Sequence, residues 1–262
     1  EFSVTKDTEL VDVATDVCRV SGTCRIVGEK GGKYQILAFK TNSKMIYAYP
    51  EDGKYEMFLE AGVYNFIITY TDEKNSKEHT LVRQEVTVPD APYEKNFDIV
   101  AGSLSGQLTW KDGTSAMYGE SSLCLYSDGF ASGDITADLK ADGSFSFSYV
   151  PYGTYTMKLD DKDIGTVTIN SADKQQDYTI NGYQIAVVVK EANGEFAKDK
   201  WIRVEKDEKT EYYYVDNDKG LALVIVDEPG TYEVCSYDNG NRIYYGTVTV
   251  TDKNVSCALT AE

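Results

Sequence analysis

Asp52-Gly53-Lys54-Tyr55-Glu56-Met57-Phe58-Leu59-Glu60-Ala61-Gly62-Val63-Tyr64 shows an arrangement that this chain uses three times: a turn glycine, an alternating strand, and a Gly-x-Tyr triplet that opens the next strand. The second copy runs from Asp142-Gly143 to Gly153-Thr154-Tyr155, and a looser third copy runs from Lys219-Gly220 to Gly230-Thr231-Tyr232. The two glycines of a copy are nine, ten and ten residues apart, and the copies recur after 91 and 77 residues. This self-similarity predicts three similar small domains in a row.

The composition is typical of a folded chain, with 42% apolar and 26% charged residues among 262. Helical periodicity is nearly absent, whereas short alternating or β-rich runs are bounded by Gly, Asp, Asn and Pro throughout. Each copy holds about seven such runs, the number expected of an immunoglobulin-like sandwich. We therefore predict an all-β fold of three tandem immunoglobulin-like β-sandwich domains over residues 17–101, 102–181 and 182–262. Residues 1–16 would be a leader or the end of an upstream repeat.

The joins between these domains are short. Ala101-Gly102-Ser103 connects the first domain to the second, and Asn181-Gly182 connects the second to the third. Joins of this length, with no Pro-rich or Ser-rich tether, restrict the angles that neighbouring domains sample. The sequence therefore predicts an extended, semi-rigid rod.

Alternation within single runs indicates which side chains enter the cores. Phe145, Phe147 and Tyr149 alternate with serines, so one face of that strand is predicted to be buried and the other wet. Residues 135–141 are predicted to form one strand.

Each Gly-x-Tyr triplet predicts a sharp start to a strand. The glycine leaves the backbone free to turn, and the tyrosine packs at a corner of the sandwich with its hydroxyl on a backbone partner. The residues concerned are Gly62 and Tyr64, Gly153 and Tyr155, and Gly230 and Tyr232.

The chain is strongly acidic, with 43 acidic and 26 basic residues and a formal net charge of −17 at pH 7. Because nucleic-acid backbones and anionic membranes would be repelled, we expect no nucleic-acid partner. The acidity is typical of an exposed soluble protein, or else of a binder of cations or basic partners. No run of about 18 apolar residues occurs, so we expect no direct membrane insertion. The start at Glu1 indicates a processed form or a piece of a longer polypeptide.

Cysteine spacing argues against a metal centre. The five cysteines include no Cys-x-x-Cys pair and the chain has one histidine, so we predict no structural zinc and no cofactor. Cys235 and Cys257 lie on two predicted strands of the last domain. They are either a disulfide pair or ordinary buried thiols.

A family resemblance rests on the first strands and the triplets. Ser21-Gly22-Thr23 and Ser105-Gly106-Gln107-Leu108-Thr109 are followed 40 and 47 residues later by Gly62-Val63-Tyr64 and Gly153-Thr154-Tyr155. Residues of about 17–260 thereby resemble the prealbumin-like or carboxypeptidase-regulatory-like β-sandwiches, relatives of the B-type repeats in Gram-positive collagen adhesins and pilins. The resemblance implies the fold, but it implies function only broadly, because such modules serve as stalks, spacers, adhesin arms and enzyme appendages.

Catalytic chemistry finds no support in the sequence. His79 follows a polar stretch, residues 72–78, that is typical of a solvated hairpin tip, and no nucleophile and orienting acid accompany it. Residues 160–163 and 216–220 bring oxygen ligands together, but neither is a full calcium loop, and turns favour Asp and Asn for backbone reasons. We predict a protein that is not an enzyme and holds no metal.

Tyrosine is unusually frequent, with 21 residues against nine Phe and two Trp. Neighbours on a strand point to opposite faces, so runs of adjacent tyrosines must present rings to solvent. Such rings could stack on sugars or anchor a protein, or simply serve as amphipathic strand residues. The candidate ligand-binding residues are Tyr47, Tyr49, Tyr213 and Tyr245.

These features predict a non-catalytic extracellular protein of the bacterial cell surface that acts as a structural stalk or adhesin arm. Its expected partners are a host protein or glycan and the neighbouring domains of a longer polypeptide. The alternative is an array of carbohydrate-binding modules that use exposed Tyr rings.

Overall fold

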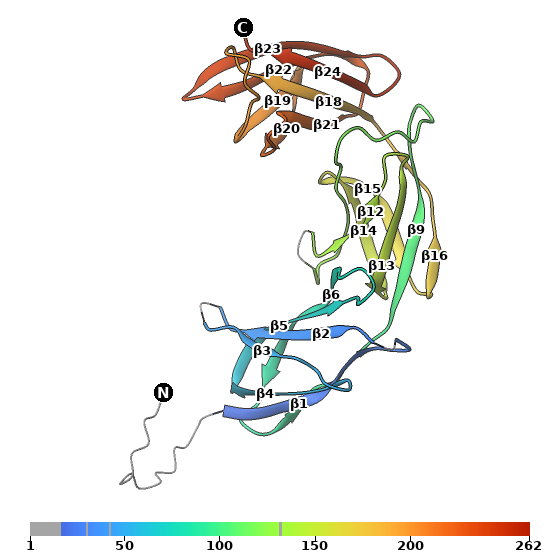
Figure 1. Cartoon of the computed structure of the whole chain (residues 1–262), viewed down its shortest axis with the longest axis vertical. Helices are drawn as coiled ribbons and strands as arrows, with labels where there is room; N and C mark the ends of the chain where they lie inside the picture. Colours follow the sequence, from blue (N-terminus) through green and yellow to red (C-terminus); the bar gives the residue numbers. More distant parts are fainter. Residues whose placement is uncertain (1–16, 30, 42, 131–132) are drawn as a thin grey trace. The chain divides into compact units, whose positions relative to one another are not determined.

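The computed structural model describes residues 17–29, 31–41, 43–130 and 133–262. Every regular element within those residues is a β-strand (Figure 1), which confirms the predicted all-β class. The chain divides into two compact units, residues 1–100 and 101–262. The division into three domains and the rod stay predictions, and the predicted leader, residues 1–16, lies outside the described residues.

The strands fall into three consecutive segments. The first segment holds β1 (Val17–Ile26), β2 (Lys33–Phe39), β3 (Ile46–Ala48), β4 (Lys54–Glu60), β5 (Gly62–Thr71), β6 (Glu78–Val88), β7 (Tyr93–Glu94) and β8 (Phe97–Ile99). The middle segment holds β9 (Ala101–Trp110), β10 (Leu123–Tyr126), β11 (Ile135–Thr136), β12 (Asp138–Leu139), β13 (Ser144–Pro151), β14 (Gly153–Leu159), β15 (Lys162–Ile169), β16 (Asp173–Gln175) and β17 (Tyr178–Ile180). The last segment holds β18 (Tyr183–Lys190), β19 (Lys200–Lys206), β20 (Lys209–Val215), β21 (Leu221–Val226), β22 (Gly230–Asp238), β23 (Asn241–Val250) and β24 (Val255–Thr260).

The same strand order occurs in all three segments. The first strand of each lies between an antiparallel strand and a parallel final strand, as β1 lies between β4 and β7–β8, β9 between β13 and β16–β17, and β18 between β21 and β24. The second sheets have the matching orders β3-β2-β5-β6, β11-β10-β14-β15 and β20-β19-β22-β23. Constant-type immunoglobulin sheets have the orders ABED and CFG instead. The segments are thus immunoglobulin-like in their architecture but not in their strand order.

The alternation predicted for β13 holds up to Phe147 and then breaks. Phe145 and Phe147 are buried in the core of the middle segment. The register between β13 and β9 then shifts before Val150, and Tyr149 has a φ of 55°. This β-bulge leaves Tyr149 half-buried and puts Val150 into the core. The single strand predicted over residues 135–141 also divides, because β11 pairs with β10 in one sheet and β12 pairs with β13 in the other.

Two of the three corner tyrosines make the backbone bond that the triplet predicts. All three are buried, and two hydroxyl bonds to the backbone four residues upstream are present. Tyr155 Oη donates to Pro151 O at 2.7 Å, and Tyr232 Oη donates to Glu228 O at 2.5 Å. Each bond ties the start of a strand to the turn before it.

The glycines of the triplets are not equivalent. Gly62 and Gly230 have φ values of 142° and 152°, a conformation that side chains rarely adopt. Gly153 does not have a positive φ, and a Cβ added there would meet its nearest atoms at an ordinary 3.4 Å. The turn at Gly153 therefore needs no glycine, contrary to the prediction.

The parallel edge strands of the first two segments are each interrupted at the middle. β7 and β8 flank Asn96, whose Oδ1 accepts a bond from Thr23 N at 2.8 Å. β16 and β17 flank Asp177, whose Oδ1 accepts a bond from Gln107 N at 2.9 Å. The side chain thus replaces the backbone bond that the interruption removes.

Backbone approach at these interruptions explains the Ser-Gly pair of both first strands. A Cβ on Gly22 would lie 2.0 Å from Lys95 O, and a Cβ on Gly106 would lie 2.0 Å from Gln176 O. Only glycine leaves room for a neighbouring backbone at that distance.

Buried contacts join the middle and last segments within the second unit. Gln184, on β18, is fully buried, and its Oε1 accepts from Tyr118 N while its Nε2 donates to Ser121 Oγ, both at 2.9 Å. Gln184 N in turn donates to Asn254 Oδ1 at 2.8 Å. Ile225 of β21 packs into the core of the middle segment. We call this set of contacts the segment joint.

Candidate ligand-binding surfaces

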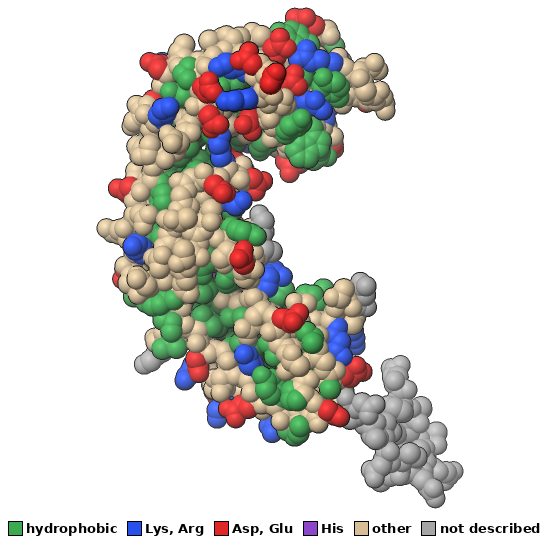
Figure 2. All heavy atoms as spheres, turned by 180° about the vertical axis from the view of Figure 1, so that it is seen from behind, with side chains coloured by type: hydrophobic (Ala, Val, Ile, Leu, Met, Phe, Trp, Pro, Cys, Tyr) green, Lys and Arg blue, Asp and Glu red, His purple; other side chains and the backbone are tan. Residues whose placement is uncertain are grey.

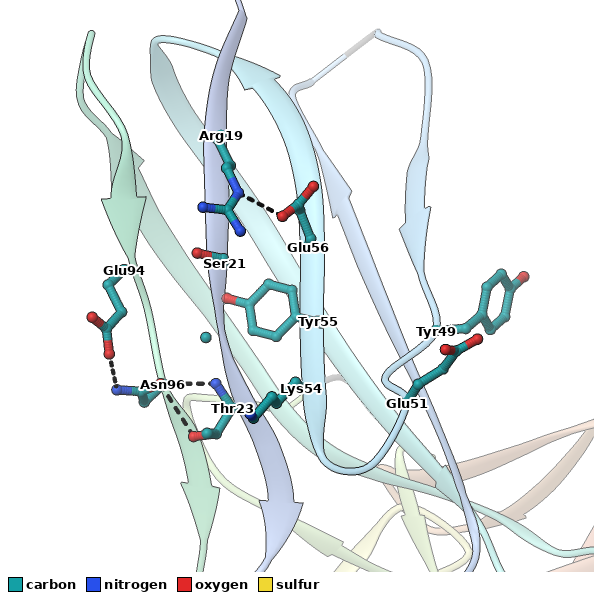
Figure 3. Close-up of a pocket in the computed structure, with 11 residues that line it drawn as sticks. Arg19, Ser21, Thr23, Tyr49, Glu51, Lys54, Tyr55, Glu56, Glu94 and Asn96 are labelled. Carbon is teal, nitrogen blue, oxygen red and sulfur yellow. Dashed lines mark hydrogen bonds and ion pairs between the residues drawn. The ribbon is translucent and has the colours of Figure 1, made fainter.

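A polar groove of about 600 Å³ lies on the first unit, over the solvent-facing side of β1, β4 and β7 (Figure 3). Strand alternation turns Arg19, Ser21 and Thr23 outward while Cys18, Val20 and Cys24 enter the core. The residues that line the groove are Arg19, Ser21, Gly22, Thr23, Tyr49, Glu51, Lys54, Tyr55, Glu56, Glu94 and Asn96.

Several polar groups of this groove already bond to one another. Arg19 Nε lies 2.5 Å from Glu56 Oε2, and Glu94 Oε1 accepts a bond from Asn96 Nδ2 at 3.0 Å (Figure 3). Tyr55 Oη donates to the backbone, and burial raises the pKa of its hydroxyl. Exposed ion pairs of this kind contribute little stability, and they compete with a ligand for the same groups. The groove therefore offers both hydrogen-bonding groups and charged groups, with Glu51, Lys54 and Glu94 among its lining residues.

Two of the four candidate ligand-binding residues lie on this unit and are accessible to solvent. Tyr49 lines the groove with 66% of its surface exposed, and its Oη accepts from Gln35 Nε2 at 3.3 Å. Tyr47 is 47% exposed, and its Oη lies 3.4 Å from Met45 Sδ. Their role in binding stays a prediction.

The rings of the other two candidate ligand-binding residues do not point to solvent. Tyr245 is buried, with its Oη 3.0 Å from Ser236 Oγ, and Tyr213 is half-buried against the core of the last segment. The expectation that they present rings to solvent is therefore wrong. Tyr213 shares its strand face with the buried Val215, a signal that the sequence contained.

Tyr245 could not have been placed by alternation. Counting back from the buried Val248 would turn Tyr245 outward. The register between β22 and β23 shifts, however, so that Val234 pairs with Gly246 and Cys235 pairs with Tyr244. This β-bulge reverses the face on which Tyr245 lies.

The exposed rings of the last segment gather on the opposite side of that sheet. We call this the ring surface, and it comprises Trp201 and Arg203 of β19, Tyr212 and Tyr214 of β20, and Tyr237 of β22. The guanidinium of Arg203 lies 5.1 Å from the ring centroid of Tyr212 and 4.3 Å from that of Tyr237. The rings of Trp201 and Tyr214 are 5.2 Å apart.

The ring surface borders a hollow of about 780 Å³. Its lining residues are Asp199, Lys200, Trp201, Arg203, Tyr212, Tyr237 and Asp238. Adjacent tyrosines in the sequence do not point to this site, because its rings come from three different strands. The sequence did contain a signal for the site. Trp201 and Arg203 alternate along the strand with the buried Ile202 and Val204, so their side chains point to the solvent-facing side of the sheet.

Of the two alternatives for Cys235 and Cys257, the structure does not contain the disulfide. Cys235 and Cys257 are free thiols on strands of different sheets. Cys235 lies buried beside Arg242 and Glu205, whereas Cys257 packs against the core of the segment. The structure shows the alternative of ordinary thiols, with Cys235 buried and Cys257 partly buried.

We expect these thiols to be unreactive until the chain unfolds. Burial raises the pKa of all five, that of Cys24 to about 12. At pH 8 about one Cys24 side chain in 10,000 would then be the nucleophilic thiolate. Labelling with an aromatic disulfide reagent should be slow in buffer and complete in concentrated guanidinium chloride. Prompt labelling of Cys24 in the native chain would contradict the structure.

The acidic turns are used for backbone bonds. Asn217 Oδ1 accepts from Lys219 N at 3.2 Å and from Leu221 N at 3.0 Å, and Asp218 pairs with Lys198. Among the residues that the structure describes, no three His, Cys, Asp or Glu side chains are arranged to hold a metal ion. The turn chemistry of Asp and Asn accounts for this stretch.

Comparisons with known proteins found no matching family model and no matching curated protein. The chain is similar to the Bacillus anthracis TIE protein (TM-score 0.27, 13% identity), covering 94% of this chain and 51% of that chain. It is also similar to a Streptococcal ancillary pilin (TM-score 0.26, 8% identity, 94% and 99% covered) and to a putative adhesin from Bacteroides ovatus (TM-score 0.28, 8% identity, 76% and 96% covered). The chain thus spans about half the length of the TIE protein chain. At these TM-scores the strand order of the three segments carries the fold assignment.

Proposed function

We propose that this chain is a non-catalytic arm of an extracellular bacterial surface protein, acting as a structural stalk or an adhesin. The observation that carries the proposal is the segment joint, in which Gln184 of one sandwich is buried among groups of another. Two domains that merely shared a chain would not need such a contact. A spacer needs such a contact, because a rigid joint holds the next domain at a fixed distance and angle.

The connection between the middle and last segments supports the same role. Only Asn181 and Gly182 separate β17 from β18. Gly182 lies so close to β21 that an added Cβ would be 2.7 Å from Val226 O. This connection of two closely packed residues leaves little freedom for a hinge between the middle and last segments.

The surface chemistry also fits a soluble, non-enzymatic arm. Figure 2 shows acidic and basic side chains interspersed on the face that it presents, and the net charge of −17 favours solubility. The one histidine, His79, lies in the β5–β6 strand pair opposite Tyr70, with the ring centroids 6.5 Å apart. In the part of the chain that is described, no helix is long and apolar enough to cross a bilayer.

Nuclear magnetic relaxation of backbone amides tests the arm directly. If the segment joint is rigid, amides of β9–β17 and of β18–β24 will report the same overall tumbling time in the intact chain. Two clearly different times would show that the segments move independently, and the spacer role would be lost.

A second candidate function, carbohydrate binding, is favoured by one observation, the ring surface beside its hollow. Binding of the intact chain to immobilised glycans and extracellular-matrix proteins, with and without calcium, separates the roles. Retention by a matrix protein would support an adhesin. A blank across the panel would leave the stalk.

A further inference from the structure

The size of the hollow beside the ring surface suits a small or linear ligand better than a folded protein. Sites for small molecules measure about 300–1,000 Å³, and this one measures about 780 Å³. A standard protein interface instead engages about 20–30 residues on each side, whereas seven residues line this hollow. The geometry therefore favours a ligand that fits among a few side chains.

The charges of the hollow indicate a ligand without net charge. Two carboxylates, Asp199 and Asp238, face two cations, Lys200 and Arg203. Lys200 is already paired with Glu191 at 2.5 Å, and the guanidinium of Arg203 lies over two tyrosine rings. The net charge of −17 further disfavours an anionic polymer.

The rings are arranged in a row that crosses the sheet. Trp201 pairs with Tyr214 on β20, and the register of Ile202 with Ser236 brings Tyr237 beside Trp201 on the other side. Three neighbouring strands make such a row about 10 Å long. A row of apolar faces with polar groups along its edge matches a chain of pyranose rings, which have apolar faces and hydroxyl edges.

The row stands on strands rather than on loops, which holds its rings in place. Beside it on the same face of the sheet, Arg242 Nη2 lies 2.9 Å from Glu205 Oε2 and 2.8 Å from Glu233 Oε2. Cys235 is fully buried in the same sheet. A site fixed in advance loses less entropy when a ligand binds.

From these observations we propose that the ring surface is a binding site for a neutral polysaccharide, with Trp201, Tyr214 and Tyr237 as stacking residues and Asp199 and Asp238 as hydrogen-bond acceptors. The inference rests on the second candidate function and not on the arm. Relaxation of backbone amides on both sides of the segment joint tests the proposed arm, whereas glycan binding tests the ring surface. Either proposal can therefore fail without the other.

Tryptophan fluorescence provides the readout, because the two tryptophans differ. Trp201 is 57% exposed and Trp110 is 1% exposed, so an external quencher reports mainly on Trp201. The probes are soluble β-glucan, xylan, mannan and amylose, with heparin and collagen as the anionic and protein comparisons. We expect one neutral probe to protect Trp201 from quenching and to retain the chain in affinity electrophoresis.

Substitutions then locate the site. Trp201→Ala and Tyr237→Ala should each weaken retention by about tenfold or more. Tyr152→Ala, which removes an exposed ring from the middle segment, is the matched control and should leave retention unchanged. Because these side chains are exposed, near-ultraviolet circular dichroism should show that each variant is folded. Retention by no neutral probe, retention only by heparin or collagen, or retention that survives Trp201→Ala would each overturn the proposal.

Discussion

Replacing Gly106 by alanine should destabilise the middle segment by about 3 kcal/mol or more. The added Cβ would lie 2.0 Å from Gln176 O and 2.9 Å from the Phe145 ring, and a backbone carbonyl cannot move away as a flexible side chain can. Either β9 separates from β16 and β17, or the core around Phe145 shifts. Urea unfolding of the full chain measures the loss, and amide hydrogen exchange should show it concentrated in β9, β16 and β17.

Gly153→Ala is the matched control in the same segment. Its Cβ would meet nothing closer than 3.4 Å, and its φ is one that alanine adopts, so we expect a change of less than about 1 kcal/mol. If both substitutions had the same small effect, the close approach at Gly106 would not exist in solution.

Replacing Gln184 by leucine should weaken the segment joint while preserving volume. Tyr118 N and Ser121 Oγ lose their partner, and an unpaired buried polar group costs about 1–3 kcal/mol. We expect faster hydrogen exchange at the Tyr118 amide and separate tumbling times for β9–β17 and β18–β24. Gln175→Leu changes an exposed glutamine and should alter neither quantity. A Gln184 variant that tumbles as one body would show that apolar contacts such as Ile225 suffice for the joint.

Much of the fold could be read from the sequence because its signals are local. In β4, Tyr55, Met57 and Leu59 are buried and alternate with exposed residues, as the alternating run between Gly53 and Gly62 predicts. The corner tyrosines follow from the Gly-x-Tyr triplet in the same way, since Tyr155 and Tyr232 bond to backbone only four residues away.

The candidate site was harder to predict because it depends on pairing between strands. Alternation gives two faces but does not say which one is buried, and the bulge opposite Cys235 reverses the faces within one strand. The grouping of Trp201 with Tyr214 and of Arg203 with Tyr237 needs the order β20-β19-β22, which no local pattern contains. Whether Cys235 and Cys257 can pair likewise depends on which sheet each strand joins, and no local pattern in the sequence shows this.

The parallel pairing of first and last strands determines how each segment would respond to mechanical load. Because β18 and β24 run in the same direction side by side, the chain enters the segment at one end of the sheet and leaves at the other. Tension applied through the chain would therefore pull these strands along each other, and the ladder from Ile185 to Lys190 would be loaded in shear, with all its bonds sharing the force. The β1–β8 and β9–β17 pairs have the same geometry, so each segment is built to resist stretching rather than to peel open.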